Sequence, residues 1–288
     1  MEQLGPEQLN KLWQSVERQE ATEEEYALAE EKMLDAYSSV WRQALLLEGH
    51  ADLQESLLSE LSRYLGGTDV AEIRNRCQGA VHAIKEGWNE KTNRSASRAA
   101  VEEFYDHNPA MLYELMWWHS LEEDTDPLGY VTALHFAKQH RCRSYLDFGA
   151  GVGAGGILFA RHGFEVTLAD ISSELLGFSK WRLDLRKLDG EYIDLKAQGF
   201  PPEAFDFMTA MDVFEHLFDP VGTVEDLGSA MKPGGYLFAR LHPDTNEDRP
   251  LHIVQDFGPV YKRLGELGFK EVWRDEWVWG HQVFQKPR

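Results

Sequence analysis

The stretch Ser144-Tyr-Leu-Asp-Phe-Gly-Ala-Gly-Val-Gly-Ala-Gly-Gly156 predicts a buried strand, a glycine-rich turn and the beginning of a helix. Such a turn presents backbone N–H groups at a helix N-terminus, where the main chain approaches a nucleotide-like ligand closely. Two acidic residues accompany it, because Asp147 precedes the first glycine and Asp170 ends the next apolar strand. The stretch therefore predicts an α/β fold that binds an adenosine-containing ligand.

The glycine turn alone is compatible with more than one function. The pattern Gly151-x-Gly153-x-x-Gly156, with Asp170 near the offset of a ribose-binding acid, fits a dinucleotide site of an NAD(P)-dependent oxidoreductase. Glycines that merely permit a close turn are the structural alternative. The Asp147 carboxylate would repel a pyrophosphate and suits a ligand with a cationic amino group. The chain also shows no second nucleotide-binding half, which disfavours the dinucleotide.

The composition of the chain restricts its expected cellular location and its expected binding partners. The chain has 288 residues and a formal net charge of −20, which disfavours nucleic acids and anionic membranes as partners. Its two cysteines, Cys77 and Cys142, form no ligand or disulfide pattern, so we expect a reducing, cytoplasmic location. Residues 1–20 are polar and charged, so no signal peptide is expected, and no apolar run approaches a membrane span.

The chain divides near residue 140. Residues 1–140 carry a net charge of −14 and residues 141–288 a net charge of −6. Helical spacing and a Thr22/Glu25 capping box predict an all-helical region over 1–140 that serves as substrate cap or dimerisation surface. Residues 141–288 alternate strands with helices, which predicts a Rossmann-like, doubly wound, mostly parallel seven-stranded sheet that ends in an antiparallel hairpin. The expected strands are 144–148, 165–169, 191–195, 205–211, 236–241, 269–274 and 278–285.

Two downstream segments distinguish between the candidate cofactors. Combined with the glycine turn, Phe205–Leu217 and Met231–Leu237 give the chain a pattern that resembles the class I S-adenosylmethionine-dependent methyltransferases, in particular the ubiquinone-biosynthesis-like small-molecule group. The resemblance covers about residues 100–285. It implies S-adenosylmethionine as cofactor and a set of cofactor-binding residues: Tyr105, Asp147, Gly149, Ala150, Gly151, Gly153, Asp170, Ile171, Asp194, Leu195, Met211 and Asp212.

The resemblance also implies a role for each group. The loop from Asp147 to Gly153 surrounds the methionine moiety, and Asp170 accepts from both ribose hydroxyls. Ile171 packs on the adenine, and the pair Asp194-Leu195 reads its edge. Met211 and Asp212 line the methyl-transfer cleft. Tyr105 closes over the methionine end, with a core tyrosine as the alternative.

Methyl transfer is a direct displacement, so the protein mainly holds the nucleophile in line with the sulfonium methyl and removes a proton where one is present. His216, after the fourth strand, is the first candidate for a general base, and His242, after the fifth, is the second. The alternatives to a general base are that these histidines cap a helix or support other residues, or that the reaction uses no dedicated base. No metal site is expected.

Two groups of aromatic residues indicate the chemical type of the methyl acceptor. Met111–His119 and the tryptophans Trp273, Trp277 and Trp279 form either a cage for a cation or a flat molecule, or part of the core. Together with the acidic surroundings, these aromatic residues favour a neutral, cationic or aromatic small molecule as the methyl acceptor, as in specialised metabolism. The methyl group would be transferred onto an O, N or C nucleophile of this molecule. A basic peptide or protein acceptor and a non-catalytic interaction module are alternatives. Helices within 22–65 are candidates for a homodimer interface.

Overall fold

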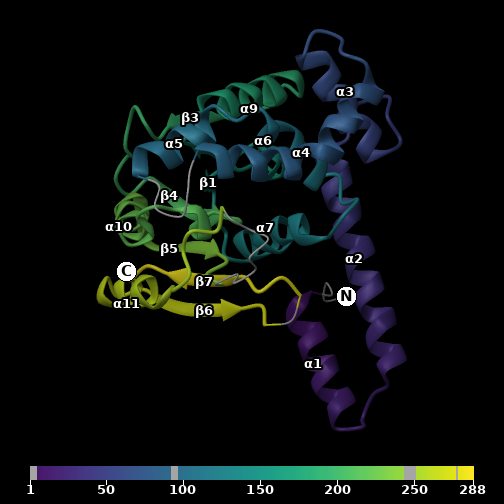
Figure 1. Ribbon diagram of the computed structural model, residues 1–288. Coiled ribbons are helices and arrows are strands. Elements are labelled where there is room, and N and C mark those ends of the chain that lie inside the picture. Colours follow the sequence, from purple (N-terminus) through teal and green to yellow (C-terminus); the bar gives the residue numbers. More distant parts are fainter. Residues whose placement is uncertain (1–4, 92–96, 243–250, 277) are drawn as a thin grey trace.

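The computed structural model describes residues 5–91, 97–242, 251–276 and 278–288. Within them, seven strands form one sheet in the order β3-β2-β1-β4-β5-β7-β6 (Figure 1). β7 runs antiparallel to both of its neighbours, and the other pairs of adjacent strands are parallel. The predicted fold class is confirmed. The strands are β1 (Ser144–Phe148), β2 (Glu165–Asp170), β3 (Glu191–Asp194), β4 (Phe205–Ala210), β5 (Met231–Ala239), β6 (Lys270–Arg274) and β7 (Gln282–Gln285).

Each face of the sheet carries its own hydrophobic cluster. In β1, Tyr145 packs into one cluster and Leu146 into the other, as the alternation of side chains along a strand requires. The first face is covered by α7 (Gly129–Gln139), α8 (Ala154–Arg161) and α9 (Ser173–Leu185), and the second by α10 (Pro220–Ala230) and α11 (Gly258–Glu266). This doubly wound arrangement leaves the carboxyl ends of the parallel strands open for a ligand.

The described residues before position 140 form helices, as predicted. Thr22 accepts from the Glu25 backbone and Glu25 from the Thr22 backbone, so the expected capping box begins the second helix. The short 3-10 turn η1 (Asp126–Leu128) leads into α7. Figure 1 shows α1 and α2 at one side of the sheet and α4, α5 and α6 along another. The helices are α1 (Pro6–Glu17), α2 (Glu23–Leu45), α3 (Leu53–Tyr64), α4 (Val70–Lys91), α5 (Arg98–Asp106) and α6 (Ala110–Trp118).

Two local predictions differ from the structure. The fifth strand begins at Met231 rather than at residue 236, because residues 232–235 form an irregular part of β5, where the register with β4 shifts between Phe205 and Phe207 and Gly234 takes φ +79°. The last strand begins at Gln282 rather than Val278, because the Asp275 carboxylate accepts from the backbone of Val278 and Trp279 and holds that segment outside the ladder.

The helices of the first half share one hydrophobic core with the sheet. Trp41 of α2 and Trp88 of α4 belong to the same buried cluster as Tyr145 of β1 and Phe238 of β5. The division at residue 140 stays a prediction. Within the described ranges, no helix combines the length and the apolar character needed to cross a membrane.

Candidate cofactor and acceptor cleft

A cleft of about 740 Å³ lies at the carboxyl ends of β1, β2 and β4. This volume falls within the range of small-molecule sites, roughly 300–1,000 Å³. Side chains of α4, α5 and α6 cover it, so the first half of the chain forms its roof and the second half its floor. The predicted site residues that line it are Tyr105, Gly149, Ala150, Gly151, Asp170, Ile171, Met211, Asp212 and His216.

The glycine turn has a backbone conformation in which residues with a side chain would be strained. Gly149, Gly151 and Gly153 all have positive φ, at +72°, +51° and +72°. A Cβ on Gly149 would lie 2.4 Å from a methyl group of Val213, and one on Gly151 would lie 2.8 Å from a methyl group of Leu115. The turn is therefore packed between the segment after β4 and helix α6, with its backbone at the cleft.

Asp170 connects the turn to the end of β2. Its two carboxylate oxygens accept from the backbone N–H groups of Gly151 and Ser172, each at 2.8 Å. The side chain is 6% exposed, and burial raises the pKa of its carboxyl group. A carboxylate has about four acceptor sites, so two remain for donors in the cleft, such as a pair of ribose hydroxyls.

Asp147 occupies a different environment. It is fully buried, and its oxygens accept from the hydroxyls of Tyr130 and Thr209, at 3.1 and 3.0 Å, and from the backbone N–H of Gly156 at 3.1 Å. Burial raises the pKa of the Asp147 carboxyl group to about 6. It does not line the cleft, so the geometry gives no support to direct contact with a ligand's amino group. Its contacts join β1, β4, α7 and α8 beneath the turn.

Four further predicted residues also lie outside the cleft lining. Gly153 is the N-cap of α8 and packs against Ser179 and Leu168. Asp194 ends β3 and accepts from the Ser173 hydroxyl at 2.8 Å, while Leu195 packs on the hydrophobic cluster of the second face. His242 follows β5 and is exposed. The cleft therefore brings together most, but not all, of the expected set.

Tyr105 and His216 meet at the wall of the cleft. The Tyr105 hydroxyl lies 3.0 Å from Nδ1 of His216, and the same Nδ1 lies 3.0 Å from the carbonyl oxygen of Leu251. Because a carbonyl oxygen only accepts, this geometry assigns the ring proton to Nδ1 and the lone pair to Nε2. Burial raises the pKa of the Tyr105 phenol well above its usual value, so Tyr105 stays protonated, and its oxygen accepts from the Nδ1 proton of His216.

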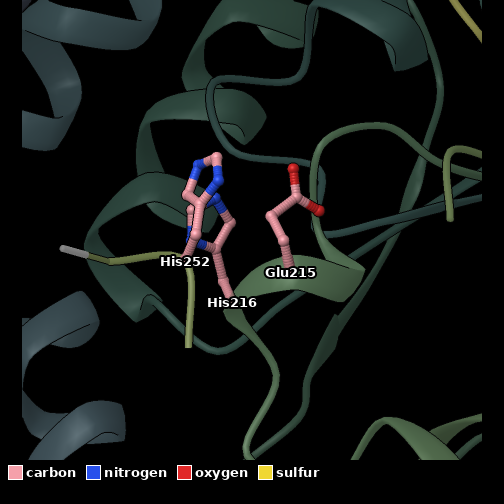
Figure 2. Close-up of side chains that lie close together, drawn as sticks. All are labelled: Glu215, His216 and His252. Atoms are coloured by element: carbon pink, nitrogen blue, oxygen red, sulfur yellow. The ribbon is translucent and has the colours of Figure 1, made fainter. Parts of the chain in front are cut away.

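Three side chains near this pair have the composition of a metal-binding group. Figure 2 shows the imidazoles of His216 and His252 beside the carboxylate of Glu215, and their nearest ligand atoms lie within 4.8 Å of one another. Two ligands that share an ion at about 2.1 Å lie at most about 4.2 Å apart. The upper bound of 4.8 Å is close to this limit, so the three side chains form a candidate metal-binding group. His252 comes from a segment far along the chain, which is why no sequence pattern indicated the group.

The aromatic residues divide between cleft and core. Met111 and Trp118 line the cleft. Trp273 stacks on Phe238 with ring centroids 5.8 Å apart, and Trp279 stacks on Tyr37 at 5.9 Å, so both pack within the protein. Trp277 lies outside the described residues. The hairpin tryptophans that are described therefore contribute to packing rather than to a cage.

The lining of the cleft is strongly acidic. Among the described residues, Lys85 and Arg98 are its only lysine or arginine side chains. The acidic ones are Glu102, Glu114, Glu123, Asp124, Asp126, Asp170, Asp212, Glu215, Asp219, Glu225 and Asp226. Most of these acidic residues, as well as Tyr130, were not predicted from the sequence, because they belong to helices and turns that carry none of the recognised motifs.

A topology of this kind, with a glycine turn after β1 and an acid after β2 at one cleft, defines a doubly wound cofactor-binding protein. Residues 117–267, just over half of the chain, match the family model described as a methyltransferase domain. The chain belongs to this family. It is a class I S-adenosylmethionine-dependent methyltransferase, and its cofactor is S-adenosylmethionine.

Individual relatives match a shorter stretch. The ubiquinone biosynthesis O-methyltransferase of Albidiferax ferrireducens is 31% identical over 134 residues, which cover 42% of this chain and 52% of that protein. The enzyme of the same name from Coxiella burnetii is 28% identical over 135 residues, covering 42% and 55%. The chain thus spans about half the length of these relatives. Among solved structures, the N-methyltransferase NodS of Bradyrhizobium japonicum with S-adenosylhomocysteine is 18% identical, with a TM-score of 0.49 over 58% of this chain and 91% of that chain.

Proposed function

We propose that this protein transfers the methyl group of S-adenosylmethionine to a small molecule bound beneath helices α4–α6. The observation that carries the proposal is the single continuous cleft, with the glycine turn and Asp170 at its floor and a roof of helical side chains. The roof and floor together bury reactants, which favours displacement by fixing their geometry. The relatives named ubiquinone biosynthesis O-methyltransferases support the transfer of the methyl group to an oxygen atom.

Calorimetry tests the cofactor part of this proposal directly. S-adenosylhomocysteine is expected to bind with micromolar affinity or better, and NADH and NADPH are expected not to bind. Detectable dinucleotide binding with no S-adenosylhomocysteine binding would instead support the oxidoreductase alternative.

We propose that His216 is the general base. Its Nε2 carries the lone pair, and its Nδ1 is held by Leu251 and Tyr105, so the ring is oriented in the way a base requires. Replacing His216 with glutamine is expected to lower the single-turnover rate roughly 100-fold, because general-base catalysis contributes about 10²–10⁴-fold. Affinity for S-adenosylhomocysteine should stay within about threefold, since Asp170 and the glycine turn are untouched. An unchanged single-turnover rate would exclude this role, and His242→Gln serves as the comparison for the second candidate.

The acceptor is expected to be neutral or cationic. A cleft with eleven acidic side chains and two lysine or arginine side chains in its lining repels anions and attracts ammonium groups. The test compares a matched pair of catechols, dopamine and 3,4-dihydroxyphenylacetate, as ligands of the complex with S-adenosylhomocysteine. Dopamine should bind at least about fivefold more tightly, a difference that salt reduces. Equal affinity would contradict the charge argument, and preference for a basic peptide over both catechols would favour a protein acceptor.

The remaining expectations belong to the same proposal. A cytoplasmic location is supported by two cysteines that are both free in the structure. A role in specialised metabolism and a homodimer through the helices between residues 22 and 65 also remain proposals. Light scattering of the purified protein tests the dimer.

A further inference from the structure

A buried ion cluster connects the helical first half to the cofactor-binding half. The side chains of Glu60 on α3 and Arg182 on α9 are both 0% exposed, and Arg182 Nε donates to a Glu60 carboxylate oxygen at 2.7 Å. Arg186, the C-cap residue that follows α9, donates to the same carboxylate. The single Glu60 carboxylate thus pairs with two guanidinium groups inside the protein.

Arg182 also holds the glycine turn. Its Nη1 donates to the carbonyl oxygen of Val152 at 2.7 Å, and the hydroxyl of Ser179, on the same helix, donates to the carbonyl oxygen of Gly151 at 2.7 Å. From the opposite side, the N–H of Gly151 is held by Asp170. The backbone of the cofactor turn is therefore fixed between β2 and α9.

The negative charge of Glu60 stabilises the buried guanidinium group of Arg182 in this position. A buried guanidinium without a counter-ion is strongly unfavourable, so removing one partner of such a pair drives the other toward water. Movement of Arg182 toward water would release the Val152 carbonyl and loosen the turn beside Gly151, which lines the cleft. We propose that Glu60 is a positioning residue for the cofactor site and acts on the glycine turn through Arg182. The helical half thus contributes to cofactor binding from a residue that does not line the cleft.

A second arginine provides a matched control. Arg161 on α8 also connects the two halves, with its Nε donating to the carbonyl oxygen of Ala44 at the end of α2 at 2.7 Å. Among the hydrogen bonds of the described residues, none joins Arg161 to the glycine turn. A variant at Arg161 therefore weakens the docking of the first half without releasing Val152.

The experiment compares Glu60→Gln and Arg161→Met with the wild-type protein by calorimetry with S-adenosylhomocysteine, well below each melting temperature. Glu60→Gln is expected to raise the Kd about tenfold, whereas Arg161→Met lowers Tm and leaves the Kd within about twofold. Hydrogen exchange without ligand should show faster exchange in peptides covering residues 149–153 for Glu60→Gln only. This second measurement reports on the turn even if cofactor binding or turnover is abolished.

A triple variant covers the case in which Glu60→Gln does not fold. Glu60→Leu, Arg182→Met and Arg186→Met together replace the cluster by apolar side chains, an exchange that proteins often tolerate. Since it also removes the bond to Val152, it should fold, bind S-adenosylhomocysteine about tenfold more weakly and exchange faster over 149–153. The proposal is overturned if either folded variant shows wild-type affinity and exchange, or if Arg161→Met weakens binding to the same degree.

Discussion

The floor and the roof of the cleft are built in different ways. The floor consists mainly of backbone, with the turn at Gly149–Gly153 and the ends of β1, β2 and β4 held by buried carboxylates. The roof consists of side chains from α4, α5 and α6, many of them charged and partly exposed. Backbone in a packed turn has one shape, whereas exposed side chains have many.

This difference predicts where substitutions have large effects. A change at the floor alters hydrogen bonds in a buried, low-dielectric environment, where each lost bond to a charged group costs about 1.5–3 kcal/mol. A change at the roof alters the interaction of a partly hydrated charge, which is worth about 1 kcal/mol or less. Substitutions of the floor and the roof therefore test whether the cofactor and acceptor parts of the cleft are physically distinct.

The largest effect is expected for Asp170→Asn. The variant replaces one carboxylate oxygen by an NH₂ group, so it loses an acceptor for a ribose hydroxyl and faces a backbone N–H donor of Gly151 or Ser172. Only the ribose bond is absent from the free protein, and losing this bond to a charged acceptor costs about 2–3 kcal/mol, so the Kd for S-adenosylhomocysteine should rise about a hundredfold. Asp184→Asn, on the exposed side of α9, is the control and should leave the Kd unchanged. A rise below tenfold in Asp170→Asn would show that the ribose is bound elsewhere.

The floor was largely predictable from sequence because its pattern is local. Strand, glycines and terminal acid follow one another between Ser144 and Asp170, and each has a distinctive residue type. The main exception is Asp147. Its position before the turn suggested a ligand contact, but the donors of Tyr130, Thr209 and Gly156 come from three other elements that sequence spacing does not place around it.

The buried Asp147 predicts a pH-dependent stability of the floor. Its pKa is raised from 3.8 to about 6 by burial, so between these values the folded protein keeps a proton that the unfolded chain has lost. Stability therefore falls as pH rises through this range, by roughly 3 kcal/mol in total from well below pH 4 to well above pH 6, where it becomes level. Denaturant unfolding of the wild type and of Asp147→Asn, across this range, isolates the contribution as the difference between the two.

Asp147→Asn cannot titrate, so the difference in unfolding free energy between the proteins should change by about 2–3 kcal/mol between pH 4 and pH 6. Other groups contribute equally to both proteins and cancel. A difference that is constant with pH would show that Asp147 has an ordinary pKa and that its hydrogen bonds fully offset its burial.

A matched pair of glycines tests the packing under the turn. Gly155 and Gly177 both lie in helices with ordinary φ, but a Cβ on Gly155 would lie 2.3 Å from the Tyr130 ring and 2.6 Å from an Asp147 oxygen, whereas one on Gly177 meets nothing within 4 Å. Gly155→Ala should destabilise the protein by about 2 kcal/mol through overpacking. Gly177→Ala should stabilise it by up to about 1 kcal/mol, as expected for alanine in an exposed helix. Thermal unfolding measures both, and equal effects would contradict the close packing.

The roof was less predictable because its residues come from separate helices. Tyr105 was found only through the resemblance, and Glu114 and Trp118 lie in a segment whose apolar residues also suit a core. Which face of a helix covers a cleft depends on how the helices pack against the sheet. Glu60, which reaches Arg182 from 122 positions away in the chain, gives no sequence signal beyond that of a charged residue in an amphipathic helix.

The smallest effect is expected at the roof, for Glu114→Gln. Glu114 lines the cleft and lies close enough to Tyr105 to add to the rise of its pKa, so its charge acts on the acceptor region. The side chain is partly exposed, so removing the charge should cost a cationic acceptor about 1 kcal/mol, or about a fivefold rise in KM. The exposed neighbour variant Glu103→Gln should leave the KM unchanged. Because the cofactor floor is intact in both variants, affinity for S-adenosylhomocysteine should not change. A parallel loss of cofactor affinity in Glu114→Gln would mean that roof and floor act as one binding surface rather than two.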